Sequence, residues 1–248
     1  MREADGHHPR GRRPCHRGRR RGGRTAPGRL QPALRRRVPR RAREGGRGRD
    51  RHPHLLRSLT RDPKLADPAP IPPWTIFLET LIHDFDTLRY LNPGAEPAEV
   101  FAWADALVRP DFKDRGLLDT AVVTIRFDNG ALATAEASFQ AVYGYDVRGE
   151  VFGSAGMLTL GDIRRTHLTS YGAEGIAAEC VTYDQDLFHD AYVAELADFA
   201  DSVRSARTPT ATGEDARAAL TIALAAVRSV QEGAPVHLKD SRLGHTGT

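Results

Sequence analysis

Cysteine and long apolar runs are scarce in this sequence of 248 residues. The two cysteines, Cys15 and Cys180, argue against a disulfide framework, and no group of Cys and His residues has the spacing of a zinc site. The apolar runs fall far short of the roughly 20 residues that span a bilayer. The basic N-terminus also lacks the apolar segment of a secretory signal. We therefore expect a protein of the reducing cytoplasm that does not enter a membrane.

Lysine is absent from the first 53 residues, and acidic residues are few there. Residues 1–53 contain 19 Arg and four acidic residues, for a net charge of +15. Residues 54–248 contain 17 basic and 28 acidic residues, for a net charge of −11. The overall net charge of +4 averages two unlike segments and does not describe a basic protein.

Residues 1–53 have few large apolar side chains, so they cannot offset the conformational entropy of folding, and we expect disorder. Three interpretations stay open: a plain basic tail, an arm that neutralises nucleic-acid phosphates, or sequence translated out of frame. The scarcity of aromatic residues for base stacking, and the lack of a folded module to present the arginines, argue against the second. Arginine without lysine, mixed with Gly, Pro and Ala, is typical of a GC-rich gene read out of frame and favours the third.

The sequence also lacks a dinucleotide-binding pattern. No G-x-G-x-x-G follows a predicted strand, and the glycine-rich run 18–28 is filled with Arg. No alternation of strands and helices typical of a doubly wound sheet is visible. We therefore expect the Rossmann domain to be absent from this chain.

Residues 54–238 predict an α+β domain, with a mostly antiparallel open sheet and helices on one face. Alternating apolar residues predict strands over 54–61, 98–107, 119–127, 131–139, 146–152 and 157–160, short strands near 166–171 and 178–183, and an edge strand over 236–238. Helical spacing of apolar residues predicts helices over 75–91, 188–205 and 213–231. Five prolines make 62–73 a loop, and 239–248 is expected to be a flexible tail.

Two local patterns sharpen this prediction. Asp128-Asn129-Gly130 lies between two predicted strands and is a strong hairpin signal. The helix predicted over 188–205 carries a run of large apolar side chains on one face, formed by Tyr192, Leu196, Phe199 and Val203. Such a face is expected to pack on the sheet.

Glu79 and His83 are the candidate chemical groups. Positions four apart share one face of a helix, so the carboxylate and the imidazole are expected to lie one turn apart. A carboxylate raises the pKa of a neighbouring His and orients its ring, which suits proton removal from an alcohol near neutral pH. The alternative is an ordinary surface pair that contributes a few tenths of a kcal/mol.

The segment Glu79…His83-Asp84-Phe85-Asp86-Thr87-Leu88-Arg89-Tyr90-Leu91 resembles the catalytic helix of the glucose–fructose oxidoreductase/inositol dehydrogenase (Gfo/Idh/MocA) family. Further matches follow in family order over residues 119–123, 127–131, 143–156, 188–199 and 213–215. The resemblance covers about residues 54–238, and its run Tyr143-Gly144-Tyr145-Asp146 favours the inositol 2-dehydrogenase branch.

The resemblance implies roles for four residues. His83 would exchange a proton with the substrate hydroxyl, and Glu79, where the family more often has Asp, would polarise His83 or hold a hydroxyl. Tyr143 and Asp146 would contact the substrate, although packing and turn formation are the alternative for both. Two further expectations concern structure: Arg148 and Glu150 form an ion pair on a strand, and Lys113 lies in a solvated loop.

For the whole protein, the resemblance implies an NAD- or NADP-dependent oxidation of a secondary alcohol of a polyol or sugar to a ketone. It also implies a homo-oligomer formed through the sheet. Because the dinucleotide domain and the family's Glu-Lys-Pro motif are absent, we expect this chain neither to bind nicotinamide tightly nor to turn over inositol. A non-catalytic polyol-binding or oligomerisation module and an Arg-arm nucleic-acid binder are the alternatives.

The family also bears on residues 1–53. Its members often carry Gln-Val-Gly-Phe-Asn-Arg-Arg-Phe shortly before the segment that matches His54. One GC-rich coding of that stretch, read from its third base, gives Gly-Arg-Leu-Gln-Pro-Ala-Leu-Arg, which is the sequence of residues 28–35. This agreement supports translation out of frame as the origin of the segment.

Overall fold

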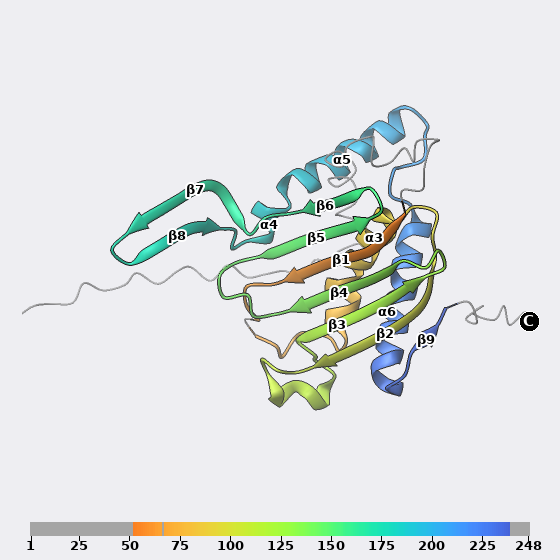
Figure 1. Ribbon diagram of the computed structural model, residues 1–248, viewed down its shortest axis with the longest axis horizontal. Helices are drawn as coiled ribbons and strands as arrows, with labels where there is room; N and C mark the ends of the chain where they lie inside the picture. The colour runs from red at the N-terminus through yellow and green to blue at the C-terminus, as the bar shows by residue number, and fades with distance from the viewer. Residues whose placement is uncertain (1–51, 66, 239–248) are drawn as a thin grey trace, which may run out of the picture.

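The computed structural model describes residues 52–65 and 67–238. The expectations for the basic segment before residue 52 and for the tail 239–248 lie outside the described residues. Figure 1 shows a broad twisted sheet with two helices behind it, a third helix above its edge and a two-stranded arm that extends to one side.

Seven strands form the main sheet and two form the arm. Their bounds are β1 Pro53–Arg61, β2 Pro97–Asp105, β3 Thr120–Phe127, β4 Leu132–Ser138, β5 Asp146–Gly153, β6 Gly156–Leu160, β7 Arg164–Gly172, β8 Gly175–Cys180 and β9 Val236–His237. Each predicted strand is confirmed, with ends that shift by a few residues. The hairpin predicted between β3 and β4 is also confirmed: Gly130, with φ of 88°, follows a turn closed by a hydrogen bond from its amide to the carbonyl of Phe127.

The helical elements are η1 Ile76–Thr80, α3 Leu81–Leu91, η2 Pro110–Arg115, α4 Asp184–Leu187, α5 His189–Arg204 and α6 Gly213–Glu232. The predicted helices over 188–205 and 213–231 are confirmed. Thr212 begins α6 with a capping box, in which its hydroxyl accepts from the amide of Asp215 and the Asp215 carboxylate accepts from the Thr212 amide.

The main sheet has the strand order β6-β5-β1-β4-β3-β2-β9. β1 runs parallel to β4, and the other neighbours are antiparallel. The predicted α+β class and the mostly antiparallel sheet are therefore confirmed, with β1–β4 as a parallel pair.

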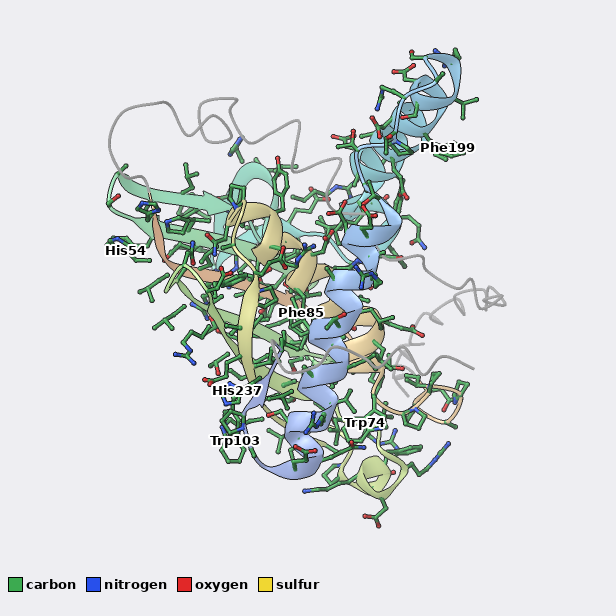
Figure 2. The ribbon with its side chains drawn as sticks, turned by 90° about the vertical axis from the view of Figure 1, so that its right-hand side faces the viewer. His54, Trp74, Phe85, Trp103, Phe199 and His237 are labelled. Atoms are coloured by element: carbon green, nitrogen blue, oxygen red, sulfur yellow. The ribbon has the colours of Figure 1, made fainter. Side chains whose placement is uncertain are left out.

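Strict alternation along the central strands places one side of the sheet in the core. In β3, Ala121, Val123, Ile125 and Phe127 are buried, while the residues between them are exposed or half-buried. α3 and α6 cover this side, and Figure 2 shows Phe85 of α3 enclosed between helix and sheet. We call the opposite side, which neither α3 nor α6 covers, the open face.

The apolar side of α5 does not pack as expected. Leu196, Phe199 and Val203 are 70%, 61% and 66% exposed, whereas the buried residues of α5 include the small Ala191 and Ala194. α3 and α6 already occupy the core side of the sheet, and α5 lies above the edge of the sheet rather than over the open face. Figure 2 shows Phe199 on the part of α5 that projects away from the sheet. The prediction of helices on one face therefore applies to α3 and α6.

Asp119 organises the loop between β2 and β3. Its fully buried carboxylate accepts hydrogen bonds from the amides of Leu107, Val108 and Arg109 at 2.8–2.9 Å. The carboxylate gives each of these three amides an acceptor in a part-buried loop, and so it holds the loop closed.

We expect Asp119→Ala to lower the free energy of unfolding by about 3 kcal/mol, because it removes the acceptor of three hydrogen bonds that contribute about 1 kcal/mol each. Urea denaturation measures this change. Asp111→Ala is the matched control: it removes an exposed carboxylate that pairs with Arg109 at 2.7 Å, and such pairs contribute about 1 kcal/mol or less. Equal effects of the two substitutions would contradict this account of the loop.

Candidate functional site

The helix predicted over 75–91 divides into two parts. Residues 76–80 form a π-helical turn, in which the amide of Leu81 donates to the carbonyl of Ile76, and α3 begins at Leu81. Such wide turns within helices are frequent at functional sites. The turn is preceded by Trp74, whose φ of 63° is uncommon for a large residue.

The π-helical turn changes the relation between Glu79 and His83. Glu79 lies on the wide turn and is exposed, while His83 lies in the first turn of α3 and is half-buried. Residues four apart share one face only within a uniform α-helix, and Glu79 and His83 lie on either side of the change from π-helix to α-helix.

Asp84 anchors the first turn of α3 to the sheet. The Ser58 hydroxyl donates to Asp84 Oδ1 at 2.5 Å. Asp84 is 2% exposed, and within the described part of the chain its Oδ2 is buried without a hydrogen-bond partner. The bond to Ser58 holds the start of α3 against β1, and thereby places the neighbouring His83 near the C-terminal end of that strand.

Asp62 lies just beyond that end of β1. Side chains alternate along a strand, so Ser58 and Thr60 point toward the side that α3 covers. Burial raises the pKa of the Asp84 carboxyl to about 7, with a further contribution from the charge of Asp62, while hydrogen bonds from Ser58 and Thr60 oppose the rise. The two carboxyls therefore lie close enough to influence each other's protonation.

The pKa of Asp62 is also raised, to about 6, first by burial and then by the charge of Asp184. Asp184 begins α4, so a third carboxyl approaches the same place from a different element. We call Asp62, His83, Asp84, Tyr145 and Asp184 the β1-end cluster.

Tyr145 directly precedes β5, and Asp62 directly follows β1. Arg61 pairs with Asp146 in the antiparallel β1–β5 ladder, so Tyr145 and Asp62 lie at the same end of these two strands. The Tyr145 amide donates to the carbonyl of Val181 at 2.7 Å, which ties this loop to the segment before α4. The preceding Gly144, with φ of 124°, approaches the same carbonyl so closely that a Cβ would lie 2.7 Å from it. Only glycine fits there.

Tyr143 and Asp146 are brought together, but on the other side of the sheet. The Tyr143 hydroxyl donates to Asp146 Oδ2 at 2.9 Å. Arg61 also bonds this oxygen, at 3.2 Å, and Arg148 bonds Asp146 Oδ1 at 2.5 Å. By strand alternation these residues point to the open face, whereas His83 lies on α3. The structure does not unite the four residues predicted from the sequence into one site.

The electrostatics of Asp146 follow from these partners. Burial raises the pKa of its carboxyl, but hydrogen bonds from Arg148 and Tyr143 and the charges of Arg148 and Arg61 outweigh that effect, so the pKa lies below its ordinary value. The expected ion pair of Arg148 with Glu150 is not formed, because Asp146, two residues before on the same face, takes the guanidinium. The expectation for Lys113 is also corrected: it lies in a 3-10 helix and pairs with Asp105 at 2.8 Å.

Comparison with known proteins identifies the fold and the motif around His83. Residues 73–238 match the model of the Gfo/Idh/MocA oxidoreductase family, C-terminal alpha/beta domain. The chain belongs to this family. The predicted resemblance is therefore confirmed, and the matched region includes the whole of α3 and the β5 strand.

Related proteins include inositol dehydrogenases. The chain is 39% identical over 193 residues to myo-inositol 2-dehydrogenase of Thermotoga maritima, a match that covers 76% of this chain and 57% of that protein. It is 39% identical over 172 residues to scyllo-inositol 2-dehydrogenase (NAD(+)) of Bacillus subtilis, covering 69% and 50%. The crystal structure of a probable dehydrogenase from Thermotoga maritima has a TM-score of 0.70 at 39% identity, covering 75% and 56%. The chain thus spans about half the length of these relatives.

The strands of residues 52–65 and 67–238 are connected differently from those of a nucleotide-binding unit. β1 and β4 are the parallel pair of this region, and they are joined through other strands rather than through the single crossover helix of a nucleotide-binding unit. No group of three or more metal-ligating side chains lies together in the same region. No helix described there is long and apolar enough to cross a bilayer.

We expect the free energy of unfolding to fall as the pH rises from about 4 to about 7. The folded-state pKa of Asp84 is about 7 against 3.8 for an ordinary Asp, so folding favours the protonated form and that stabilisation is lost as the pH rises through the folded pKa. A rise of that size in one carboxyl pKa corresponds to about 4 kcal/mol.

Urea unfolding of the wild type and of Asp84→Asn between pH 4 and pH 8 tests this expectation. The amide cannot ionise, so the variant should show a much smaller loss of stability over this range. Asp186→Asn, at an exposed position of α4, is the control and should follow the wild type. A wild-type stability that rises across this range would contradict the proposed protonation of Asp84.

Proposed function

We propose that this chain forms the substrate-binding part of an inositol dehydrogenase, in which His83 removes the proton of a ring hydroxyl while its carbon is oxidised to a ketone. The 39% identity to a myo-inositol and to a scyllo-inositol 2-dehydrogenase carries the proposal. The position of His83 in the family motif, at the end of the sheet where several polar groups meet, supports it.

The β1-end cluster has the chemistry that a polyol needs. Ring hydroxyls both donate and accept hydrogen bonds, and ionised carboxylates accept them while protonated carboxyls also donate. With a pKa of about 6, Asp62 is available in both forms near neutral pH, while the buried Asp84 holds α3 in place through Ser58. His83 stands beside Asp84, and an imidazole can accept the proton of a hydroxyl.

The other residues predicted from the sequence take different places in this proposal. Glu79 retains a role in orienting His83 or in holding a hydroxyl, from the exposed π-helical turn. Tyr143 and Asp146 remain proposed substrate contacts by family resemblance, although both face the ion pairs of the open face. Tyr145, which lies at the same end of β1 and β5 as Asp62, competes with Tyr143 for the substrate-binding role.

The hydride acceptor proposed for the reaction is NAD or NADP. One related protein is named as an NAD(+)-dependent enzyme. We propose that the main contacts with this cofactor come from residues outside 52–65 and 67–238, because the strands of this region are not joined as in a dinucleotide-binding unit. The steps assigned to the described residues are substrate binding and proton transfer.

The open face supports a proposal of self-association. Large apolar side chains are exposed along its strands, namely Leu55, Trp103, Val122, Leu132, Phe152 and Met157, with exposed fractions of 43–68%. Monomeric proteins seldom expose so continuous an apolar surface. We propose that two copies of the chain associate through this face, as the resemblance implies.

Binding of myo-inositol and scyllo-inositol to the chain, measured by calorimetric titration, tests the proposed site. We expect His83→Ala and Tyr145→Phe each to raise Kd by about tenfold, which corresponds to about 1.4 kcal/mol of lost interaction. Tyr143→Phe removes the same hydroxyl from the opposite face, so comparing it with Tyr145→Phe shows which tyrosine contacts the substrate. Tyr171→Phe, at an exposed position of β7, is the matched control and should leave Kd unchanged.

If Tyr143→Phe weakens inositol binding and Tyr145→Phe does not, the substrate contacts Tyr143 on the open face rather than Tyr145. No binding of either inositol up to millimolar concentrations would contradict the proposed site. Inositol binding that His83→Ala does not weaken would contradict the role assigned to His83. It would support a non-catalytic polyol-binding module.

A further inference from the structure

β7 and β8 form a two-stranded arm that has no supporting layer. They make a separate sheet in which each strand pairs with the other. Every residue of the two strands is exposed except Thr169 and Cys180, which are half-buried. Figure 1 shows the arm extending past the main sheet, clear of the helices.

The arm carries apolar residues that face solvent on both of its sides. Leu168, Tyr171 and Ile176 are 73%, 78% and 73% exposed. Tyr171 pairs directly with Ile176 near the tip, so these two side chains point to the same side. An isolated two-stranded hairpin is at best marginally stable in water, and it becomes stable by packing on another surface.

The tip of the arm carries little charge. From Leu168 to Ala178 its one charged side chain is that of Glu174, in the turn between the strands. A nucleic acid or an anionic membrane would be recognised by positive charge, which this part of the arm does not offer. The open face of a second copy offers exposed apolar side chains to the apolar residues of the tip.

The open face also contains a hollow of about 300 Å³. Its lining includes Leu59, Gly149 and Leu160, together with the charged residues Arg57, Arg148, Glu150 and Asp162. Both arginines already have carboxylate partners, Glu136 and Asp146, so the hollow is not a free cationic site.

The position of the hollow connects it to the arm. Gly161, Asp162 and Ile163 line the hollow and lead directly into β7, which begins at Arg164. In a dimer whose two-fold axis passes beside the start of β7, the arm of each copy lies across the hollow of the other copy. Both copies then make the same contact, as a closed symmetric dimer requires.

We propose that the β7–β8 arm is a clasp that packs on the open face of a second copy of this chain. The Tyr171–Ile176 tip lies in the hollow of that copy, next to the start of its own β7. The clasp rests on the proposed association through the open face and is independent of the catalytic assignment. It extends the interface beyond the sheet and gives the arm the packing surface that a lone hairpin lacks.

Sedimentation equilibrium of the full chain tests the clasp. We expect the wild type to dimerise and Tyr171→Asp/Ile176→Asp to raise the dimer Kd by at least 100-fold, because two buried apolar contacts become charged. Leu107→Asp is the matched control: Leu107 is 67% exposed but lies outside the arm and the open face, so its replacement should leave the Kd unchanged. Circular dichroism verifies that each variant remains folded.

Cross-linking locates the contact. In a background with Cys15 and Cys180 replaced by serine, chains carrying Tyr171→Cys are mixed with chains carrying Thr159→Cys, a residue that lines the hollow. We expect a disulfide between the two kinds of chain under mild oxidation, and none when Leu107→Cys replaces Thr159→Cys.

The outcomes separate the two proposals. A monomeric wild type at all concentrations would overturn both the association through the open face and the clasp. A wild-type dimer that Val122→Asp on β3 dissociates, while Tyr171→Asp/Ile176→Asp leaves it intact, would overturn the clasp alone. Cross-linking to Leu107→Cys as readily as to Thr159→Cys would also overturn it.

Discussion

The contact between Ser58 and Asp84 is the interaction on which the candidate site depends. It joins the first turn of α3 to β1 inside the core, at a donor–acceptor distance of 2.5 Å. A carboxyl in such a position has to remain largely protonated or well bonded, because an isolated buried charge is costly. The helix therefore carries into the core a group whose protonation responds to pH near neutrality, immediately beside the histidine of the family motif.

The same constraint explains why the polar groups collect at one end of β1. Strand alternation directs Ser58 and Thr60 toward α3, and the β1–β5 ladder brings Asp62, after β1, and Tyr145, before β5, to the same end of the sheet. Gly144 then permits the close approach of the chain to the carbonyl of Val181, which draws the start of α4 toward the cluster. Four segments that are distant in sequence meet there: the Ser58–Asp84 hydrogen bond fixes α3, and backbone geometry fixes the others.

The sequence was sufficient for the secondary structure and for the family, while the roles of Glu79, His83, Tyr143 and Asp146 stay predictions. Apolar periodicity and turn residues gave the strands, and the ordered motifs gave the family. The sequence could not place Tyr143 and Asp146 relative to His83, because their face of the sheet depends on the pairing of Asp146 with Arg61, more than 80 residues earlier in the chain. The apolar side of α5 was expected in the core because periodicity reports amphipathicity without showing whether a neighbouring surface remains free.

The parallel pairing of β1 with β4 has a consequence for how the sheet is assembled. In the order β6-β5-β1-β4-β3-β2-β9, removal of β1 leaves two separate pieces, β6-β5 and β4-β3-β2-β9. Apart from the pairing of β2 with the distant β9, each piece is built from antiparallel pairings of strands that follow one another in the chain. The earliest described strand thus joins the two pieces, and its partners are synthesised about 77–100 residues later. Contacts of such long sequence separation slow folding, because the loop must close before any stabilisation is gained. Insertion of β1 between two preformed pieces is then the step that completes the core and, with it, the cluster at the end of the strand.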